Sequence, residues 1–473
     1  MTGVAPTVIA SKWMYYLPLL ILLAGTAAAG AKEPGGVARP RAPDAPGSAA
    51  ANTQALNLEQ ILDLAYARNP DMQAAAERIG QAQAQVSEAV AAFYPKLTGR
   101  VGYDYSNDPS RAFSYIVAQR RFNQGHFDNI NQPGFVENFR PELVGTMSLF
   151  RGGSDFYRKK AAELGVAVAE LERSAFRNRL AASVTAAYYA ALAAPRQLDA
   201  SLRSLGAVES ELRHARIAYE EGTQLKSDVL SLEVRQGQAK ESELTARNAV
   251  ELTRSGLKTL LGLGVGDRLE IREEGDTQAA SPTGELANLI NQALSQRPEM
   301  QASAQQVEIR QKELRAEQGG HLPRVNAYAA YGLNERSPEF NFNRDNLTLG
   351  LNAEVDLFAG GATSARIEGA RRKLGEALAI AERTRLEIED EVQKAFATLR
   401  EAAARQTVAE TATVAANEAF RLVHEQYRNG AATVTRYLEA EADRAQAETR
   451  AVLARFDAQT ARANLQKAIG YWK

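Results

Sequence analysis

The clearest hydrophobic pattern in the chain is a strict alternation of apolar and polar residues over 346–358. A period of two places every apolar side chain on one face of a β-strand. The apolar positions that define this face are Leu347, Leu349, Leu351, Val355 and Leu357. Looser alternation over about 96–106, 140–150 and 323–334 predicts three more strands, so the sequence predicts two β-hairpins.

A second pattern follows each predicted hairpin and indicates long helices. Apolar residues recur there at near-heptad spacing, as at Leu164, Val168, Leu171 and Ala175, which is typical of helices packed side by side as coiled coils. The predicted segments are long helices over 153–221 and 361–429, with returning helices over 225–260 and 433–468. At 1.5 Å per residue, each long helix spans roughly 100 Å. Pro195 predicts a local kink in the first long helix.

The chain contains one structural unit twice. Two landmarks recur 228 residues later, and three more recur 208 residues later. The first set is Asn69-Pro70 with Arg297-Pro298, and Tyr94-Pro95 with Leu322-Pro323. The second set is Leu149-Phe150-Arg151-Gly152-Gly153 with Leu357-Phe358-Ala359-Gly360-Gly361, Tyr219-Glu220-Glu221-Gly222 with Tyr427-Arg428-Asn429-Gly430, and Leu261-Gly262 with Ile469-Gly470. Such self-similarity predicts a duplicated fold.

The duplication divides the chain into segments. The sequence predicts a first repeat over 56–262, a connector over 263–283, a second repeat over 284–470 and a tail over 471–473. The change of offset from 228 to 208 places a polar insertion with scattered aromatic residues at about 107–139. Its aromatic side chains either close over an opening in the protein, face a ligand, or pack within the loop.

The N-terminal residues have the pattern of a targeting segment. Lys12 precedes an apolar stretch over 13–29 that ends in three alanines, which predicts a cleaved signal peptide over 1–29. An uncleaved anchor is the alternative. Without any Cys, the chain is expected to carry no lipid anchor. Residues 30–55 are rich in Pro, Ala and Gly and predict a flexible linker.

The amino-acid composition excludes several kinds of chemical site but says little about the fold. The 473 residues contain no Cys, which excludes disulfides and thiolate metal sites. The formal net charge of -1 gives no general attraction to nucleic acid. The four His residues lack ligand spacing and no catalytic cluster is recognisable, so we expect no metal, no cofactor and no enzymatic activity.

The mean hydropathy of -0.34 argues against a protein that crosses a membrane with helices. It does not argue against a β-barrel, because only one face of each strand meets lipid. The predicted strands approach the 9–11 residues that a tilted membrane-spanning strand needs. Four strands cannot close a barrel, so several chains would have to share one. Alone, such strands are more typical of a soluble sandwich.

The ordered landmarks over 56–470 resemble those of the outer-membrane efflux proteins of the TolC family. This resemblance implies a mainly α-helical fold with β-structure, in which a homotrimer pools four strands per chain into one transmembrane β-barrel. The long helices would form a coiled-coil barrel across the periplasm, with an equatorial region at the connector. The strand residues Leu347, Leu349, Leu351, Val355 and Leu357 would then face outer-membrane lipid.

The resemblance also implies a site at the helical turns. There, Gly222, Thr223, Gly430 and Ala431 would contact a periplasmic adaptor, with an inner-membrane pump of RND or ABC type beyond it. In some relatives, the carboxylate at the position of Asp228 pairs with an Arg at the position of Ala432, so that pair is missing here. We expect Asp228, Arg436 and Glu439 to line the periplasmic aperture, where Arg436 and Glu439 pair with each other or with Asp228. A solvated charge on a helix surface is the competing interpretation for each of them.

The function expected from this resemblance is a passive exit duct of a tripartite efflux or type I secretion system. Two alternatives remain at the level of sequence. One is a soluble periplasmic coiled-coil adaptor or scaffold, and the other is a free-standing porin-like channel. The sequence identifies neither the cargo nor the pump.

Overall fold

The computed structural model describes residues 55–273 and 284–472. The predicted signal peptide over 1–29, nearly all of the linker over 30–55 and half of the connector over 263–283 lie outside the described residues. The end of the predicted tail, Lys473, lies outside them as well.

The described residues form a mainly helical fold with four strands, so the predicted fold class is confirmed. The first repeat contains α2 (Leu58–Arg68), α3 (Pro70–Ala91), β1 (Lys96–Ser106), α4 (Pro109–Ala118), the 3₁₀ turn η2 (Gln124–His126), β2 (Val136–Arg151), α5 (Ser154–Glu220) and α6 (Lys226–Leu260). The second contains α7 (Leu286–Gln296), α8 (Pro298–Gln318), η3 (Gly319–His321), β3 (Arg324–Leu333), η4 (Phe342–Arg344), β4 (Asp345–Glu354), α9 (Ala362–Arg428) and α10 (Val434–Ala468). The four long helices agree with the predicted ones to within one residue, and α5 continues through Pro195.

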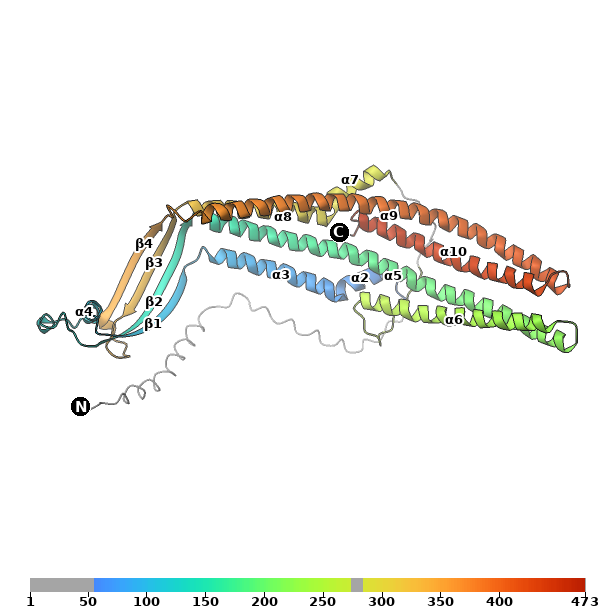
Figure 1. The fold of residues 1–473 in the computed structure, drawn as a ribbon, viewed down its shortest axis with the longest axis horizontal. Helices are drawn as coiled ribbons and strands as arrows, with labels where there is room; N and C mark the ends of the chain where they lie inside the picture. Colours follow the sequence, from blue (N-terminus) through green and yellow to red (C-terminus); the bar gives the residue numbers. More distant parts are fainter. Residues whose placement is uncertain (1–54, 274–283, 473) are drawn as a thin grey trace, which may run out of the picture. The chain divides into compact units, whose positions relative to one another are not determined.

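Figure 1 shows the sheet beyond one end of the long helices and the turns of both helical hairpins at the other end. Helix α5 packs against α6 and α3 of its own repeat and against α8 and α10 of the other repeat. Helix α9 packs against α8, α7 and α10 of its own repeat. The duplicated halves therefore meet along α5.

Two of the recurring landmarks, Asn69-Pro70 and Leu261-Gly262, lie against each other. The side chain of Asn69 caps α3 by accepting from the amides of Asp71 and Met72, and its amide donates to the carbonyl of Leu260 at the end of α6. Close by, a Cβ at Gly262 would collide with the carbonyl of Arg68. The Asn-Pro and Leu-Gly landmarks thus join the start of one helix to the end of another.

The four strands form one antiparallel sheet in the order β1-β2-β3-β4. Both hairpins have the same register: Lys96 lies opposite Thr146, and the equivalent residues Arg324 and Glu354 also lie opposite each other. The sheet has two open edges, β1 and β4, among the described residues. Open edges present unpaired backbone groups, which a lipid environment does not tolerate.

The structure corrects two boundaries. Strand β4 ends at Glu354, so Val355 and Leu357 are not residues of a strand in the single chain, contrary to the prediction over 346–358. Glu354 lies opposite Arg324, the first residue of β3, so β4 ends where its partner strand begins. Strand β2 begins at Val136, earlier than the predicted 140. The insertion expected at 107–139 is also partly regular, because Asp108 and Pro109 start helix α4.

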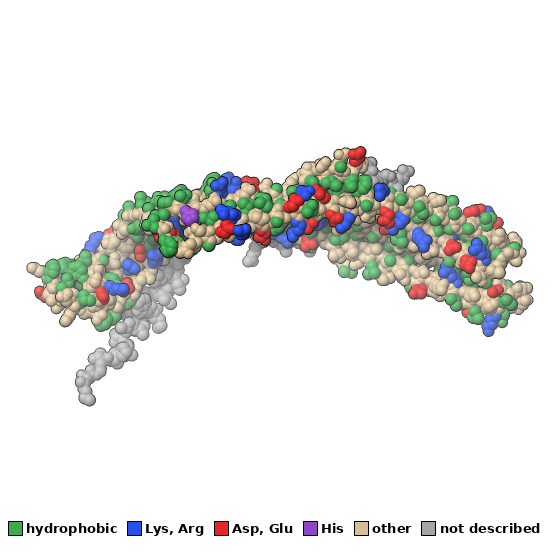
Figure 2. All heavy atoms as spheres, turned by 45° about the horizontal axis from the view of Figure 1, so that its top comes forward, with side chains coloured by type: hydrophobic (Ala, Val, Ile, Leu, Met, Phe, Trp, Pro, Cys, Tyr) green, Lys and Arg blue, Asp and Glu red, His purple; other side chains and the backbone are tan. Residues whose placement is uncertain are grey.

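No helix within 55–273 or 284–472 is long and apolar enough to cross a membrane. On the face in Figure 2, Lys and Arg are interspersed with Asp and Glu along the helices, as expected for a surface in water.

Candidate functional site

The sheet has one continuous apolar face. The register aligns Leu97 with Gly145, Gly145 with Ala329 and Ala329 with Leu349, so the apolar positions of all four strands share a face. Its large side chains are exposed in the single chain; Leu349 is 70% and Leu351 73% exposed. Burying such side chains in lipid releases about 25 cal/mol per Å² of apolar surface.

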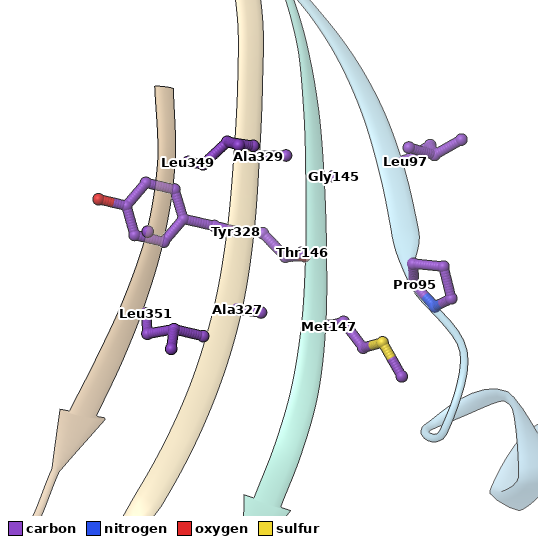
Figure 3. A pocket seen from close by; sticks show the side chains of 11 residues that line it. Pro95, Leu97, Gly145, Thr146, Met147, Ala327, Tyr328, Ala329, Leu349 and Leu351 are labelled. Atoms are coloured by element: carbon purple, nitrogen blue, oxygen red, sulfur yellow. The ribbon is translucent and has the colours of Figure 1, made fainter. Parts of the chain in front are cut away.

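A shallow hollow of about 620 Å³ lies on this face (Figure 3). Small residues, among them Gly145, Ala327 and Ala329, line its centre, and the longer side chains of Leu97, Met147, Leu349 and Leu351 surround them. The hollow has no charged side chain in its lining and only Thr146 and Tyr328 as polar residues, so it offers mainly hydrocarbon contact.

The opposite face of the sheet is polar. Arg100 lies opposite Glu142, and Asn352 lies opposite Asn326. On this face the ring of Tyr328 covers Gly350, where a Cβ would collide with the ring. A sheet with one apolar and one polar face is the arrangement of a barrel that separates lipid from water.

Hydrogen bonds attach the insertion of the first hairpin, at about 107–139, to the second hairpin. Gln119 is fully buried and donates to the carbonyl of Glu137 at 2.7 Å and to the side chain of Asn138 at 3.1 Å. Arg120 donates to the carbonyls of Asn343 at 2.5 Å and Asp345 at 2.8 Å. The rings of Phe113, Phe122 and Phe127 pack edge to face within the insertion. Of the roles considered for these aromatic residues, packing within the loop is the one that these contacts support.

Each long helix ends at a turn that contains a glycine in the left-handed conformation. Gly222 and Gly430 have φ values of 73° and 72°, in the left-handed region that a helix terminus of this type requires. The amide of Thr223 donates to the carbonyl of Ala218, and that of Ala431 donates to the carbonyl of Gln426. Both turns therefore have the same backbone conformation, and the residues at their tips are exposed.

The three predicted aperture residues are only partly brought together. Arg436 donates to Glu439 at 3.3 Å on one face of α10, and both side chains are about 60% exposed. Asp228 lies in the first turn of α6 and forms no ion pair with Arg436 within the described chain. Instead, Asp228 lies beside Tyr427, whose hydroxyl accepts a hydrogen bond from Gln224 at 3.1 Å. Burial raises the pKa of Tyr427, and the nearby acidic groups add to that effect.

Close to the turns, a buried charged cluster joins the two halves of the chain. Glu441 of α10 is fully buried. Its carboxylate accepts from the hydroxyl of Ser204 on α5 at 2.5 Å and from the guanidinium of Arg235 on α6 at 2.9 Å. We call Ser204, Arg235 and Glu441 the latch. Sequence analysis missed the latch, because a Glu in a charged helix looks like a surface residue unless the packing is known.

An aromatic cluster beside the latch holds α9 against α10. The rings of Phe420 and His424 stack at 5.6 Å, and those of Tyr427 and Tyr437 stack at 5.1 Å. The guanidinium of Arg444 lies 4.1 Å from the centre of the Phe420 ring. Burial raises the pKa of Tyr437, so its hydroxyl stays neutral. Four-residue spacing from Phe420 to His424 is the only sequence signal for this cluster.

Comparison with known proteins decides the family. The sequence profile named outer membrane efflux protein matches residues 61–263 and 289–471, which is most of the chain and follows the two repeats. The chain belongs to the outer membrane efflux protein family. Its fold and its family are those of channel and transport proteins.

Among relatives of this efflux protein, the alkaline protease secretion protein AprF of Pseudomonas aeruginosa is 24% identical over 353 residues, which are 73% of this chain and 69% of AprF. The protein CyaE of Bordetella pertussis is 24% identical over 74% of this chain and 70% of its own length. The crystal structure of the CmeC outer membrane channel of Campylobacter jejuni matches with a TM-score of 0.75 at 17% identity, over 87% of this chain and 85% of CmeC. The outer membrane protein VceC of Vibrio cholerae matches with a TM-score of 0.72 at 18% identity, over 87% of this chain and 96% of VceC.

Potential metal ligands do not gather in the part of the chain that the structure describes. Within that part, no three His, Asp or Glu side chains lie close enough to hold a metal ion. The candidate functional surfaces are therefore the two faces of the sheet, the helical turns and the latch.

Proposed function

We propose that the protein is a passive exit duct in the outer membrane, the last component of a tripartite export system. The observation that carries the proposal is the sheet with one exposed apolar face, one polar face and two open edges. Such a sheet is stable in a bilayer only when further strands close its edges and lipid covers its apolar face. The duct itself uses no energy, so a pump in the inner membrane drives the cargo.

The proposed assembly is a homotrimer. Three chains supply twelve strands, which is enough for a barrel with a water-filled interior. The exposed turns at Gly222–Thr223 and Gly430–Ala431 are the proposed contact surface for a periplasmic adaptor, which connects the duct to an RND or ABC pump. The predicted signal peptide takes the chain across the inner membrane.

The alternative of a soluble periplasmic scaffold requires the apolar face of the sheet to be covered by protein. Within the described residues, the leucines of that face on β4 are 65–73% exposed. This observation favours the duct over the scaffold.

We further propose that Asp228, Arg436 and Glu439 control the aperture in the trimer. In the single chain, Arg436 and Glu439 are exposed and their ion pair contributes little, about 0–1 kcal/mol. When three copies bring these residues around one axis, the same charges lie at a constriction and act on passing ions.

Two classes of cargo fit this duct. AprF is an alkaline protease secretion protein, whereas OprN and CmeC, which share this fold, are outer membrane channels. Deleting the pump that operates with this duct distinguishes the two: loss of a secreted protein indicates the first class, and accumulation of small toxic molecules indicates the second.

Fractionation and conductance test the proposal. The full chain, expressed in a Gram-negative host, is expected in the outer membrane, and the purified protein is expected to form discrete conductance steps in planar bilayers. Recovery in the soluble periplasm without detergent would exclude the duct.

The aperture role is tested separately in the same bilayers. Glu439→Ala and Asp228→Ala are expected to raise the current through the closed channel, because each removes a charge from the constriction. Glu368→Ala, which breaks a comparable exposed ion pair near the start of α9, is the control and should leave the current unchanged. Unchanged closed-state current in both aperture variants would contradict the role.

A further inference from the structure

The connection between β1 and β2 is longer than a duct requires. It comprises residues 107–135, which we call the cap, whereas residues 334–344 are enough to connect β3 to β4. The additional length folds into helix α4 and the 3₁₀ turn η2. Figure 1 shows α4 beyond the end of the sheet that lies away from the long helices. In the proposed duct, this end of the sheet is the exit.

The cap reaches across the end of the sheet to its far edge. Arg120 directly follows the last turn of α4, and its guanidinium donates to the carbonyls of Asn343 at 2.5 Å and Asp345 at 2.8 Å. Asp345 is the first residue of β4, which lies two strands away from β2 in the sheet. At about 4.8 Å per strand, the cap therefore crosses roughly 10 Å of the sheet.

The cap covers the polar face of the sheet where β2 begins. Asn138 belongs to that face, because it alternates with Arg140 and Glu142 and lies opposite Asp104. On the water-filled side of a barrel, a polar residue near the end of a strand is expected to be exposed, but Asn138 is fully buried. Its side chain accepts a hydrogen bond from Gln119 of the cap at 3.1 Å. The cap thus lies on the side of the sheet that faces the interior of the proposed barrel.

The residue that attaches the cap to β4 has an unusual backbone. Arg120 has a φ of 54°, and no other non-glycine residue of the described chain has a positive φ. The amides of Arg120 and Arg121 donate to the carbonyls of Val117 and Ile116, respectively, which is the pattern of a helix end that favours glycine. The strain at Arg120 is offset by its guanidinium, which bonds to the second hairpin.

The cap also has a small core of its own. Ala112 and Ile116 of α4 are buried, and the ring of Phe122 packs against those of Phe113 at 5.2 Å and Phe127 at 5.1 Å. These contacts join α4 to the turn that follows it. The cap is therefore a folded unit and not an open loop.

The size of the cap matches the opening that it borders. A barrel of twelve strands, spaced about 4.8 Å apart and tilted by about 40°, has a radius of roughly 12 Å at its backbone. The ten residues of α4 form a helix about 15 Å long and, with side chains, about 10 Å wide. Three such helices, one from each copy, occupy most of an opening of this size.

We propose that the caps of three copies constrict the exit of the duct and limit the size of the molecules that pass it. This inference rests on the proposed function and gives a role to residues that a plain duct does not need. Gln119 and Arg120 hold each cap over the polar face of its own chain. Small solutes and extended chains pass between the caps, whereas bulky molecules are excluded in both directions.

Labelling of single cysteines from outside the cell tests the proposal, and the chain has no native Cys to interfere. Thr348→Cys places a thiol on the polar face of β4, near the end of the strand that lies beside the cap. Whole cells receive either a small charged methanethiosulfonate or a maleimide that carries a long polyethylene glycol chain. The small reagent should label Thr348→Cys, and the large reagent should leave it unlabelled.

Two changes to the cap should admit the large reagent. In the first, a Gly-Ser linker as long as residues 334–344 replaces residues 107–135. In the second, Arg120→Gly removes the guanidinium and suits the left-handed backbone, so the cap is released without added strain. Labelling of Thr348→Cys by the large reagent should rise at least several-fold in both variants. Arg111→Ala, which removes an exposed charge from α4, is the matched control and should not change the labelling.

A second cysteine separates the possible failures. Gly125→Cys, in the exposed turn η2, should react with both reagents, also in combination with Arg120→Gly, and so reports that the chain reaches the cell surface. Labelling of Thr348→Cys by the large reagent with the cap intact would overturn the constriction, while the proposed function would stand. Exclusion of the large reagent even after replacement of the cap would place the restriction in the barrel and also overturn the role of the cap. Absence of any labelling at either position would contradict the proposed function itself.

Discussion

Asn69 and Arg297 occupy the same position in the two repeats, directly before the Pro that begins α3 and α8. Asn69 caps its helix with neutral hydrogen bonds. The guanidinium of Arg297, only 7% exposed, instead forms ion pairs with Glu299 at 3.1 Å and with Glu391 of α9. Lys467 of α10 donates to the other oxygen of Glu391 at 2.9 Å. One carboxylate therefore holds α8, α9 and α10 together.

Glu391 is expected to make the stability of the fold depend on pH. Burial alone would raise its pKa, but hydrogen bonds from Arg297 and Lys467 outweigh burial and lower the pKa below 4.5. A lowered pKa stabilises the folded state above the unfolded pKa, and this stabilisation disappears as the pH falls through the folded pKa. Glu391→Gln should therefore cost about 1 kcal/mol at pH 7 and nothing at a pH below the folded pKa.

Thermal unfolding followed by circular dichroism in detergent measures this difference from pH 7 to pH 3. Glu387→Gln, which removes a 67% exposed carboxylate paired with Arg383 at 3.4 Å, is the control and should change stability little at any pH. A loss for Glu391→Gln that is equally large at pH 7 and pH 3 would show that packing, and not the charge, is responsible.

At the scale of elements, the two helical hairpins have the same lengths and different environments. The latch residue Glu441 and its counterpart Glu233, 208 residues earlier, show this difference. Glu441 is fully buried against α5 and α6, whereas Glu233 pairs with Arg216 at 2.7 Å and is 40% exposed. The counterparts of Ser204 and Arg235 are Ala412 and Asp443, so the latch has no equivalent set of residues in the second hairpin.

Glu441→Ala is expected to destabilise the joined hairpins by about 3 kcal/mol, because it leaves Arg235 without its buried partner. Glu233→Ala is the matched control and should cost less than about 1 kcal/mol, since its ion pair is exposed to water. Urea unfolding followed by circular dichroism compares the two. Equal losses would mean that the latch contributes no more than a surface pair.

The sequence correctly predicts where an element begins and ends when residues close to that point in the chain determine it. Glycines in left-handed conformation end the long helices, and Asn-Pro starts α3, so these boundaries depend on residues close in the chain. The end of β4 depends on a partner strand and was predicted wrongly. The latch joins residues 206 and 237 positions apart, so only packing reveals it. The aperture residues show the same limit: α10 brings Arg436 to Glu439 locally, whereas Asp228 lies on α6 and forms no ion pair with Arg436 in the described chain.

At the scale of the whole molecule, polar and apolar residues are separated by face and not by segment. The described helices carry charges of both signs, and on β4 the exposed Leu347, Leu349 and Leu351 share one side of the sheet. A low mean hydropathy is therefore compatible with a protein that meets lipid. Because the edges of the sheet are open, a single chain would expose unpaired backbone groups to lipid. A single chain therefore cannot be the unit that enters the membrane.

Two neighbouring residues of β4 test which face meets lipid. Leu349 lies on the apolar face and is 70% exposed in the single chain, whereas Thr348 points to the polar face. Leu349→Arg should cost about 2–4 kcal/mol near the middle of the bilayer and reduce the protein recovered in the outer membrane. Thr348→Arg should leave that recovery unchanged and instead alter the ion selectivity in planar bilayers, because its charge lies in water inside the barrel. If both variants insert equally well, the apolar face is covered by protein and the lipid contact proposed for Leu347, Leu349 and Leu351 is wrong.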